Sequence, residues 1–586
     1  MAFRLRFPMA RRQPTISTLL PSLANLAGER LDPGGAPVAD VHDRLIGDAQ
    51  PIALDLRWLR GSDDLLRWSA GLAGTLTPLR YQALVTHTEQ HGYRGHARQK
   101  TTHGTARVLH NLSGVELAWQ AQLFSMPLAE NPGALTAAEM HSGPRQPAAS
   151  FVTKGARKDV NQAQLSVTAR RPLTEGEVTA SLYGGTRDLD NPLTFAVVAI
   201  DRTTFGGSVR ITSAAAPLGP RHRLSAGVDI QRLDDDRKNF ENCNGVAAAT
   251  TACPRADTVE RGALRLDQRE IVTSVGPFVR DEIALGDRVH IHAGLRADYV
   301  IFDVEDRFII PPGPGENPDD SGRRTLRAWS PMAGMIARLG ALTAVYANVA
   351  TAFETPTATE LANRPEGAGG INRDLEPQHA TTVEVGLKGI LASRLRYDVA
   401  GFATDVRDEL IPFEVPSGGG RRYFRNAGRT TRRGLEAGLE LSAGSATFAS
   451  AYIYSGFRFD DYAVTTGTVT ERYDGNRIPG IPLHQLQASM TWRRGGLFFT
   501  AEGITSGRVF VDDANSAAAA GWTVANMRIG GRIPIGGTSL MPVVAVQNVF
   551  DRPYTGSVVV NAAGGRFYEP APERTFSIGA NVTTAR

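Results

Sequence analysis

Strict alternation of apolar and polar residues is the most regular feature of this sequence. In TTVEVGLKG, residues 381–389, Val383, Val385 and Leu387 fall on one side of an extended chain, and Glu384 and Lys388 fall on the other. Alternation over this length predicts a β-strand with unlike environments on its two faces.

The same pattern recurs from about residue 65 to the C-terminus, and the polar faces carry full charges and amides. Examples are GVELAWQAQL (114–123), RLSAGVDI (223–230), RVHIHAGLR (288–296) and QLQASMTW (485–492). Clusters of Gly, Asp, Asn and Pro separate these segments, as turns require. We find neither linkers nor a fixed-period repeat, which argues against a chain of small sandwiches, a propeller or a solenoid.

Connections of two lengths alternate along the chain. Short turns such as TARRPLTEGEVTAS (168–181) alternate with long stretches at 126–158, 232–262, 303–325, 352–378, 457–480 and 552–571. This arrangement is typical of outer-membrane barrels. At roughly 24 residues per strand, the chain predicts about 22 strands. We therefore expect an all-β fold: a large antiparallel transmembrane β-barrel with long extracellular loops, short periplasmic turns and apolar faces directed outward to lipid.

Composition and the lack of known motifs argue against several other classes of protein. No run approaches the roughly 18 apolar residues of a membrane-spanning helix. The net charge of +4 is small for 586 residues, and its basic residues are interspersed, so no nucleic-acid partner is expected. No P-loop, HExxH, GxSxG or zinc spacing occurs, so we predict neither an enzyme nor a cofactor nor a metal site. His290 and His292 are interpreted as polar residues of the barrel interior, and RLDDDRKNF (232–240) as a solvated charge run in a long loop.

The two cysteines, Cys243 and Cys253, lie in a Gly-, Ala-, Thr- and Asn-rich stretch that is typical of a loop. Their spacing and the lack of accompanying histidines do not favour a metal site. We predict a loop-closing disulfide, as expected outside the cytoplasm. Two unpaired loop thiols are the alternative.

Four segments, in order, resemble the barrel of the TonB-dependent outer-membrane receptor family. An early strand and loop of that family is matched by LRYQALVTHTEQHGYRGHAR, and a mid-barrel signature by YANVATAFETPTATEL with NRDLEPQHATTVEVGLKG. The strand pair FRNAGRTTRRGLEAGLEL and the final VAVQNVFDRPYTG with GRFYEPAPERTFSIGANV complete the resemblance. The matching positions are Phe353, Pro356, Glu360, Asn372, Leu375, Pro377, Glu384, Gly386, Asn426, Gly428, Arg433, Gly434, Glu436, Asn548, Phe550, Asp551, Tyr554, Gly565, Arg566, Pro570, Arg574 and Gly579.

Most of these positions have a structural explanation. Pro356 and Pro377 are expected to end strands, because proline cannot donate to a β-ladder. Gly386 and Gly434 are expected to allow bends or a close approach within the barrel wall.

The resemblance implies an outer-membrane receptor that imports a scarce nutrient, most often a ferric siderophore, with energy from the TonB complex of the inner membrane. The expected partners are thus outer-membrane lipid, a ferric siderophore or similar chelate, and TonB. A passive outer-membrane pore or a non-functional barrel remnant is the alternative. In GRRYFRN, Arg421, Arg422, Tyr423 and Arg425 suit an anionic iron chelate through charge and stacking.

Two departures from the family bear on this expectation. Residues 1–55 are too few for the family's plug domain and lack strand alternation, so we predict an atypical, disorder-prone segment before a barrel at 56–586. Two interpretations of this segment stay open. TISTLLPSLANLAG is a degenerate export signal, or the gene start is misplaced or damaged. The second would leave the receptor truncated and its coupling to TonB in doubt. The chain also ends in SIGANVTTAR rather than on an aromatic residue.

Overall fold

The structure is a computed structural model of the chain. It describes residues 52–213, 221–255, 260–311, 317, 319–362, 371–414, 422–466 and 468–584. The predicted N-terminal segment, 1–55, lies almost entirely outside these residues, and the first strand begins at Ala53.

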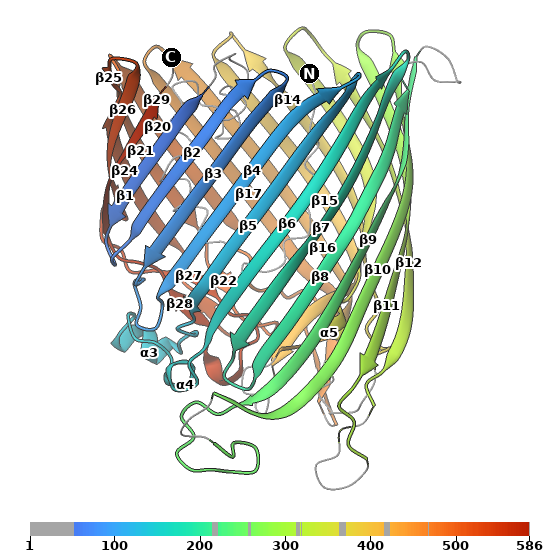
Figure 1. Ribbon diagram of the computed structural model, residues 1–586, viewed down its shortest axis with the longest axis vertical. Helices are drawn as coiled ribbons and strands as arrows, with labels where there is room; N and C mark the ends of the chain where they lie inside the picture. Colours follow the sequence, from blue (N-terminus) through green and yellow to red (C-terminus); the bar gives the residue numbers. More distant parts are fainter. Residues whose placement is uncertain are drawn as a thin grey trace.

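The architecture is a closed antiparallel barrel of 22 strands, as the sequence predicts (Figure 1). Each strand pairs with the next one along the barrel, and β1 closes the ring by pairing with β29, where Trp58 lies opposite Ala580. Closure leaves no unpaired edge, so every strand is hydrogen-bonded on both sides.

The barrel strands of the first half are β1 (Ala53–Gly61), β2 (Leu66–Leu76), β3 (Leu79–Gln90), β4 (Gln99–Leu112), β5 (Val115–Glu130), β6 (Arg157–Leu173), β7 (Gly176–Pro192), β8 (Val197–Ser213), β9 (His222–Asn242), β10 (Arg261–Leu285) and β11 (Val289–Asp306). Those of the second half are β12 (Gly322–Arg338), β13 (Thr343–Glu354), β14 (Gln378–Leu391), β15 (Leu395–Glu414), β16 (Arg422–Ala443), β17 (Ala446–Asp461), β20 (His484–Arg494), β21 (Leu497–Ser506), β24 (Trp522–Gly531), β26 (Thr538–Gln547) and β29 (Thr575–Thr584).

The remaining elements are short. β25 (Ile533–Ile535) continues β24 along β26. Three small hairpins lie in the loops: β18 (Ala463–Thr466) with β19 (Val469–Arg472), β22 (Val509–Phe510) with β23 (Ala518–Ala519), and β27 (Thr555–Val558) with β28 (Tyr568–Pro570). The helices are α3 (Ala137–Ser142), α4 (Ala149–Thr153), α5 (Ala358–Ala362) and the 3₁₀ turn η3 (Ala563–Gly565). None of the described helices is long and apolar enough to cross a membrane.

The apolar face of β14 points outward. Val383, Val385 and Leu387 are 49, 54 and 39 % exposed, whereas Glu384 and Lys388 on the inner face are half-buried. The outward direction of the apolar face is therefore confirmed. An outer surface of this kind is stable only against another apolar medium, since large exposed apolar areas are otherwise rare.

Short turns lie at one end of the barrel and long loops with the helices and small hairpins lie at the other (Figure 1). This asymmetry confirms the predicted loop pattern, but one assignment was wrong. RLDDDRKNF is part of β9 and not of a loop. Asp234 pairs with Arg269 of β10, and Asp235 pairs with Arg202 of β8. As consecutive residues of a strand, these two carboxylates point to opposite faces.

Glycines in the wall make room for aromatic rings of the neighbouring strand. Gly386 lies opposite Tyr346, and a Cβ atom at Gly386 would come within 2.3 Å of the tyrosine ring. Gly434 lies opposite Phe402 in the same way, with a 2.2 Å approach. The predicted close approach at both glycines is confirmed, and each ring covers backbone that has no side chain of its own.

Two apolar clusters hold the loops on the barrel rim. One packs Leu361 of α5 and Leu375 against Phe302 of β11, and the other packs Tyr462 and Ile478 against Phe459 of β17. The sequence motifs serve the same purpose. Glu360 and Thr357 form a reciprocal cap at the start of α5. Asn426 and Asn548 bond backbone groups at the bases of two loops, and Arg574 bonds Asp551. Pro356 and Pro377 lie just outside β13 and β14, as predicted.

Candidate ligand-binding site at the loop end

The tip of the β15–β16 hairpin carries the residues that the sequence marked for ligand contact. Arg421 and the side chain of Arg422 lie outside the described residues. Tyr423 is buried and packs against the ring of Phe413, 5.8 Å between ring centroids. The guanidinium carbon of Arg425 lies 3.9 Å from the centre of the same ring, in a cation–π stack.

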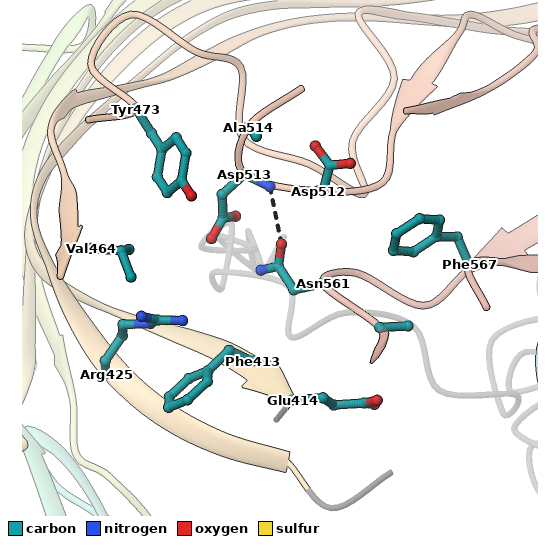
Figure 2. Close-up of a pocket in the computed structure, with 11 residues that line it drawn as sticks. Phe413, Glu414, Arg425, Val464, Tyr473, Asp512, Asp513, Ala514, Asn561 and Phe567 are labelled. Atoms are coloured by element: carbon teal, nitrogen blue, oxygen red, sulfur yellow. Dashed lines mark hydrogen bonds between the residues drawn. The ribbon is translucent and has the colours of Figure 1, made fainter. Parts of the chain in front are cut away.

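Arg425 lines a cavity of about 230 Å³ that five segments enclose (Figure 2). Phe413 and Glu414 come from β15, Arg425 from β16, Val464 and Tyr473 from the segment after β17, Asp512, Asp513 and Ala514 from the loop between β22 and β23, and Asn561, Ala562 and Phe567 from the loop between β27 and β28. The wall therefore combines three aromatic rings with three carboxylates and one guanidinium.

Asp513 is the most deeply buried charged residue of this wall, at 6 % exposure. Its Oδ2 accepts a hydrogen bond from the Tyr462 hydroxyl at 3.1 Å, and its backbone N–H donates to Oδ1 of Asn561 at 3.0 Å. Burial raises the pKa of the Asp513 carboxyl to about 6. Burial also raises the pKa of Tyr473, to about 12, with a contribution from its hydrogen bond to Glu471.

Residues 548–574, which we name the crossing loop, span the barrel mouth. On one side, Arg566 forms two hydrogen bonds with Glu139 of α3, and Tyr568 and Leu135 exchange backbone hydrogen bonds. On the other side, Asn561 donates to the Pro412 carbonyl of β15 at 3.1 Å. Since β5 and β15 lie on nearly opposite sides of the ring, the crossing loop bridges the opening.

The inner wall below the mouth carries two arginines side by side. Arg187 of β7 is directly opposite Arg202 of β8, and alternation places both inward, because Leu182 and Phe205 are exposed on the outer face. Arg202 is paired with Asp235 at 2.6 Å, whereas Arg187 has no ion pair with a described residue and its buried Nε lacks a hydrogen-bond partner there. Lys158 of β6 adds a third charge near Arg187.

Other sequence candidates lie away from the cavity. Cys243 and Cys253 are joined by a disulfide in the loop between β9 and β10. His290 and His292 lie on the inner face of β11. In the described part of the chain, no group of three or more His, Cys, Asp or Glu side chains is arranged to hold a metal ion.

Sequence reasoning missed Asp513, Asn561 and Arg187. Alternation alone places Arg187 on an inner face, but nothing local indicates that Arg202 is its neighbour. Asp513 and Asn561 lie in turn-rich loop sequence without periodicity, and their meeting depends on loops from distant parts of the chain.

Comparison with known proteins identifies the fold. Residues 52–549 match the family model described as TonB dependent receptor-like, beta-barrel. This chain belongs to the TonB-dependent receptor family. The receptor's loop end is accordingly the extracellular end, and the family is one of receptors and transporters.

Solved structures agree with this assignment. The siderophore receptor PiuA from Acinetobacter baumannii has 14 % identity and a TM-score of 0.72, over 91 % of this chain and 82 % of PiuA. The ferric-catecholate import receptor Fiu from K12 E. coli, in its closed form, has 16 % identity and a TM-score of 0.71, over 91 and 82 % of the two chains. The copper transporter OprC has 17 % identity and a TM-score of 0.71, over 92 and 82 %. At these identities the likeness concerns the barrel fold and not the cargo.

Proposed function

We propose that this receptor lies in the bacterial outer membrane and takes up a ferric siderophore or a similar anionic chelate, with energy from TonB. Membership of the receptor family and the siderophore receptors among similar structures support the general role. The observation that carries the anionic cargo is the juxtaposition of Arg187, Arg202 and Lys158 on the inner wall.

Asp235 neutralises Arg202, whereas Lys158 and Arg187 carry like charges that repel each other, so this arrangement costs free energy in the empty barrel. An anion placed between Lys158 and Arg187 would offset that repulsion and supply the partner that Arg187 Nε lacks. Arg421 and Arg422 would add charge for the first encounter with the same anion. Tyr423 packs against the Phe413 ring on which Arg425 stacks.

Uptake of radioactive iron tests this function. A host that lacks its own siderophore receptors would express the full chain and receive ferric siderophores of different chelating chemistry. We expect saturable uptake of at least one chelate, and loss of that uptake in a host without TonB. Uptake that continues without TonB would indicate a passive pore and overturn the proposal.

We name Arg187, Arg202 and Lys158 together the arginine wall, and two substitutions test it. Arg187→Gln and Lys158→Gln should each raise the half-saturating chelate concentration by roughly tenfold, since a charge-assisted hydrogen bond is lost. Arg171→Gln, on the outer face of β6, is the matched control and should leave uptake unchanged. Unchanged uptake in all three variants would contradict a role for the inner-wall charges.

A separate variant tests Arg421 and Arg422. Chelate binding that is unchanged after both are replaced by Ala would contradict their role in ligand contact.

A further inference from the structure

The cavity at the barrel mouth has a polarity that does not suit the anionic part of a chelate. Glu414, Asp512 and Asp513 place three carboxylates on its wall against the single guanidinium of Arg425. An anion would be repelled by three groups and attracted by one, so the cavity calls for different chemistry from the arginine wall.

Most polar atoms of this wall are already occupied. Oε2 of Glu414 accepts a hydrogen bond from the Ala563 N–H at 3.1 Å, and the carboxylate of Asp512 accepts bonds from the backbone and hydroxyl of Ser516. The amide of Asn561 bonds both Pro412 and Asp513. These groups hold the loops together and have little capacity left for a ligand.

Two buried atoms are exceptions. Oδ1 of Asp513 and Nε of Arg425 have no partner of hydrogen-bond geometry among the described residues. The Asn561 side chain lies close enough to the Asp513 carboxyl to oppose the rise that burial causes in its pKa, but the Nδ2 of Asn561 is bonded to the Pro412 carbonyl. The two side chains form no ion pair with each other there, and Figure 2 shows the Asp513 carboxylate directed into the space between Tyr473, Arg425 and Asn561. A buried polar atom without a partner costs on the order of 1–3 kcal/mol, so both atoms favour an occupant.

The free acceptor and the free donor define that occupant. A group that fits must donate a hydrogen to Asp513 Oδ1 and accept one from Arg425 Nε. A hydroxyl or a carboxamide does both and is neutral, whereas a carboxylate leaves Asp513 unsatisfied and an ammonium or amidinium leaves Arg425 unsatisfied. Phe413, Tyr473 and Phe567 provide apolar walls for a ring or a hydrocarbon frame.

We propose that this cavity is a binding subsite for a neutral hydroxyl- or carboxamide-bearing group of the ligand, recognised by Asp513 and Arg425. The subsite rests on the proposed receptor function only because a ligand must enter at the mouth, and it does not depend on iron or TonB. The subsite binds a neutral group at the periphery of the ligand, while the arginine wall below binds the negatively charged part.

Three isosteric probes test the subsite without any substitution. Benzamide, benzoate and benzamidine share one shape and differ in charge, being neutral, anionic and cationic at pH 7.5. Saturation-transfer NMR on the full chain in detergent should show benzamide binding at least threefold more tightly than either ion. Tighter binding of benzoate or benzamidine, or no binding of benzamide, would overturn the proposal.

Substitutions then assign the contacts. Asp513→Asn and Arg425→Met should each weaken benzamide binding by about tenfold, because a hydrogen bond to a charged group is removed. Asp188→Asn, an exposed carboxylate on the outer face of β7, is the matched control and should bind benzamide normally. Benzamide binding that is indifferent to Asp513 and Arg425 in folded protein would place the probe elsewhere and contradict the assignment. Since no uptake is measured, probe binding and iron transport can fail independently.

Discussion

The hydroxyl of Tyr462 donates a hydrogen bond to Oδ2 of Asp513 at 3.1 Å, and this bond joins the loop after β17 to the loop between β22 and β23. Tyr462 is itself fully buried against Phe459, with 4.8 Å between ring centroids. Tyr462 is therefore one anchor of the cavity on the barrel wall, and the bond from Asn561 to the Pro412 carbonyl is another.

Tyr462→Phe should loosen the loop that carries Asp513. Removing the hydroxyl leaves a second oxygen of a buried carboxylate without a donor, which costs about 1–3 kcal/mol. Hydrogen exchange of residues 507–521 should become faster, while the barrel strands stay protected. Tyr454→Phe, whose hydroxyl has no hydrogen bond among the described residues, is the control, and equal exchange in the two variants would contradict the anchoring role.

The same loop should respond to pH. Burial raises the pKa of Asp513 to about 6 from 3.8, so the folded loop binds this proton more tightly than the opened loop. Protection is then greatest below the lower value, falls by on the order of 3 kcal/mol as pH rises through 6, and is constant above it. Tyr462 and Tyr473 also face the carboxyl, and burial raises the pKa of both hydroxyls, so neither titrates in that interval. The charged groups of Arg425, Glu414 and Asp512 line the same cavity.

Hydrogen exchange between pH 4 and 8, corrected for intrinsic rates, measures this dependence. Asp513→Asn should remove it. A native profile that stays flat, or one that rises with pH, would show that the carboxyl is not held in its neutral form by burial.

Val385→Arg should prevent stable insertion of the barrel. The side chain is 54 % exposed on the outer face, and an arginine near the middle of the bilayer costs about 2–4 kcal/mol. Thr382→Arg, on the inner face of the same strand, should be tolerated. Folding into lipid vesicles, followed by the mobility shift of unheated barrel on a denaturing gel, distinguishes the two, and equal folding would argue that β14 does not face lipid.

Gly386→Ala should destabilise the wall through Tyr346. The new methyl group would lie 2.3 Å from the tyrosine ring, so the ring must move, at a cost of about 1–3 kcal/mol. Gly386→Ala in a Tyr346→Ala background should cost much less, because the clash is gone. Gly503→Ala in β21, where a Cβ meets nothing within 4 Å, serves as control for loss of glycine alone. Urea unfolding of the four variants measures the coupling, and additive effects would contradict it.

Reduction of the Cys243–Cys253 disulfide should affect only its own loop. The bridge closes a short segment between β9 and β10, and such a closure stabilises by about 3 kcal/mol at most. Protease should cut within 244–252 after reduction, whereas the unfolding midpoint of the barrel should not change. Loss of barrel stability in a Cys243→Ala, Cys253→Ala variant would show that the loop also supports the strands.

The sequence by itself determined the strands, the approximate strand number and the direction of the apolar faces. Side chains alternate with a period of two along any strand, so Val383, Val385 and Leu387 must share a face whatever the rest of the chain does. The motif around Pro356 likewise follows a local backbone requirement. Gly386 and Gly434 also carried the family resemblance, but their requirement comes from the rings of Tyr346 and Phe402 on neighbouring strands.

Only the tertiary structure decided which charges and loops meet. RLDDDRKNF resembles a loop because charge is unusual in a strand, and its place in β9 depends on β8 and β10 extending beside it beyond the apolar zone. Arg187 meets Arg202 through the register of two strands, and the cavity around Asp513 forms where segments from 413 to 567 converge. Register and loop closure are set by contacts between residues far apart in the chain, and a periodic local pattern carries no information about them.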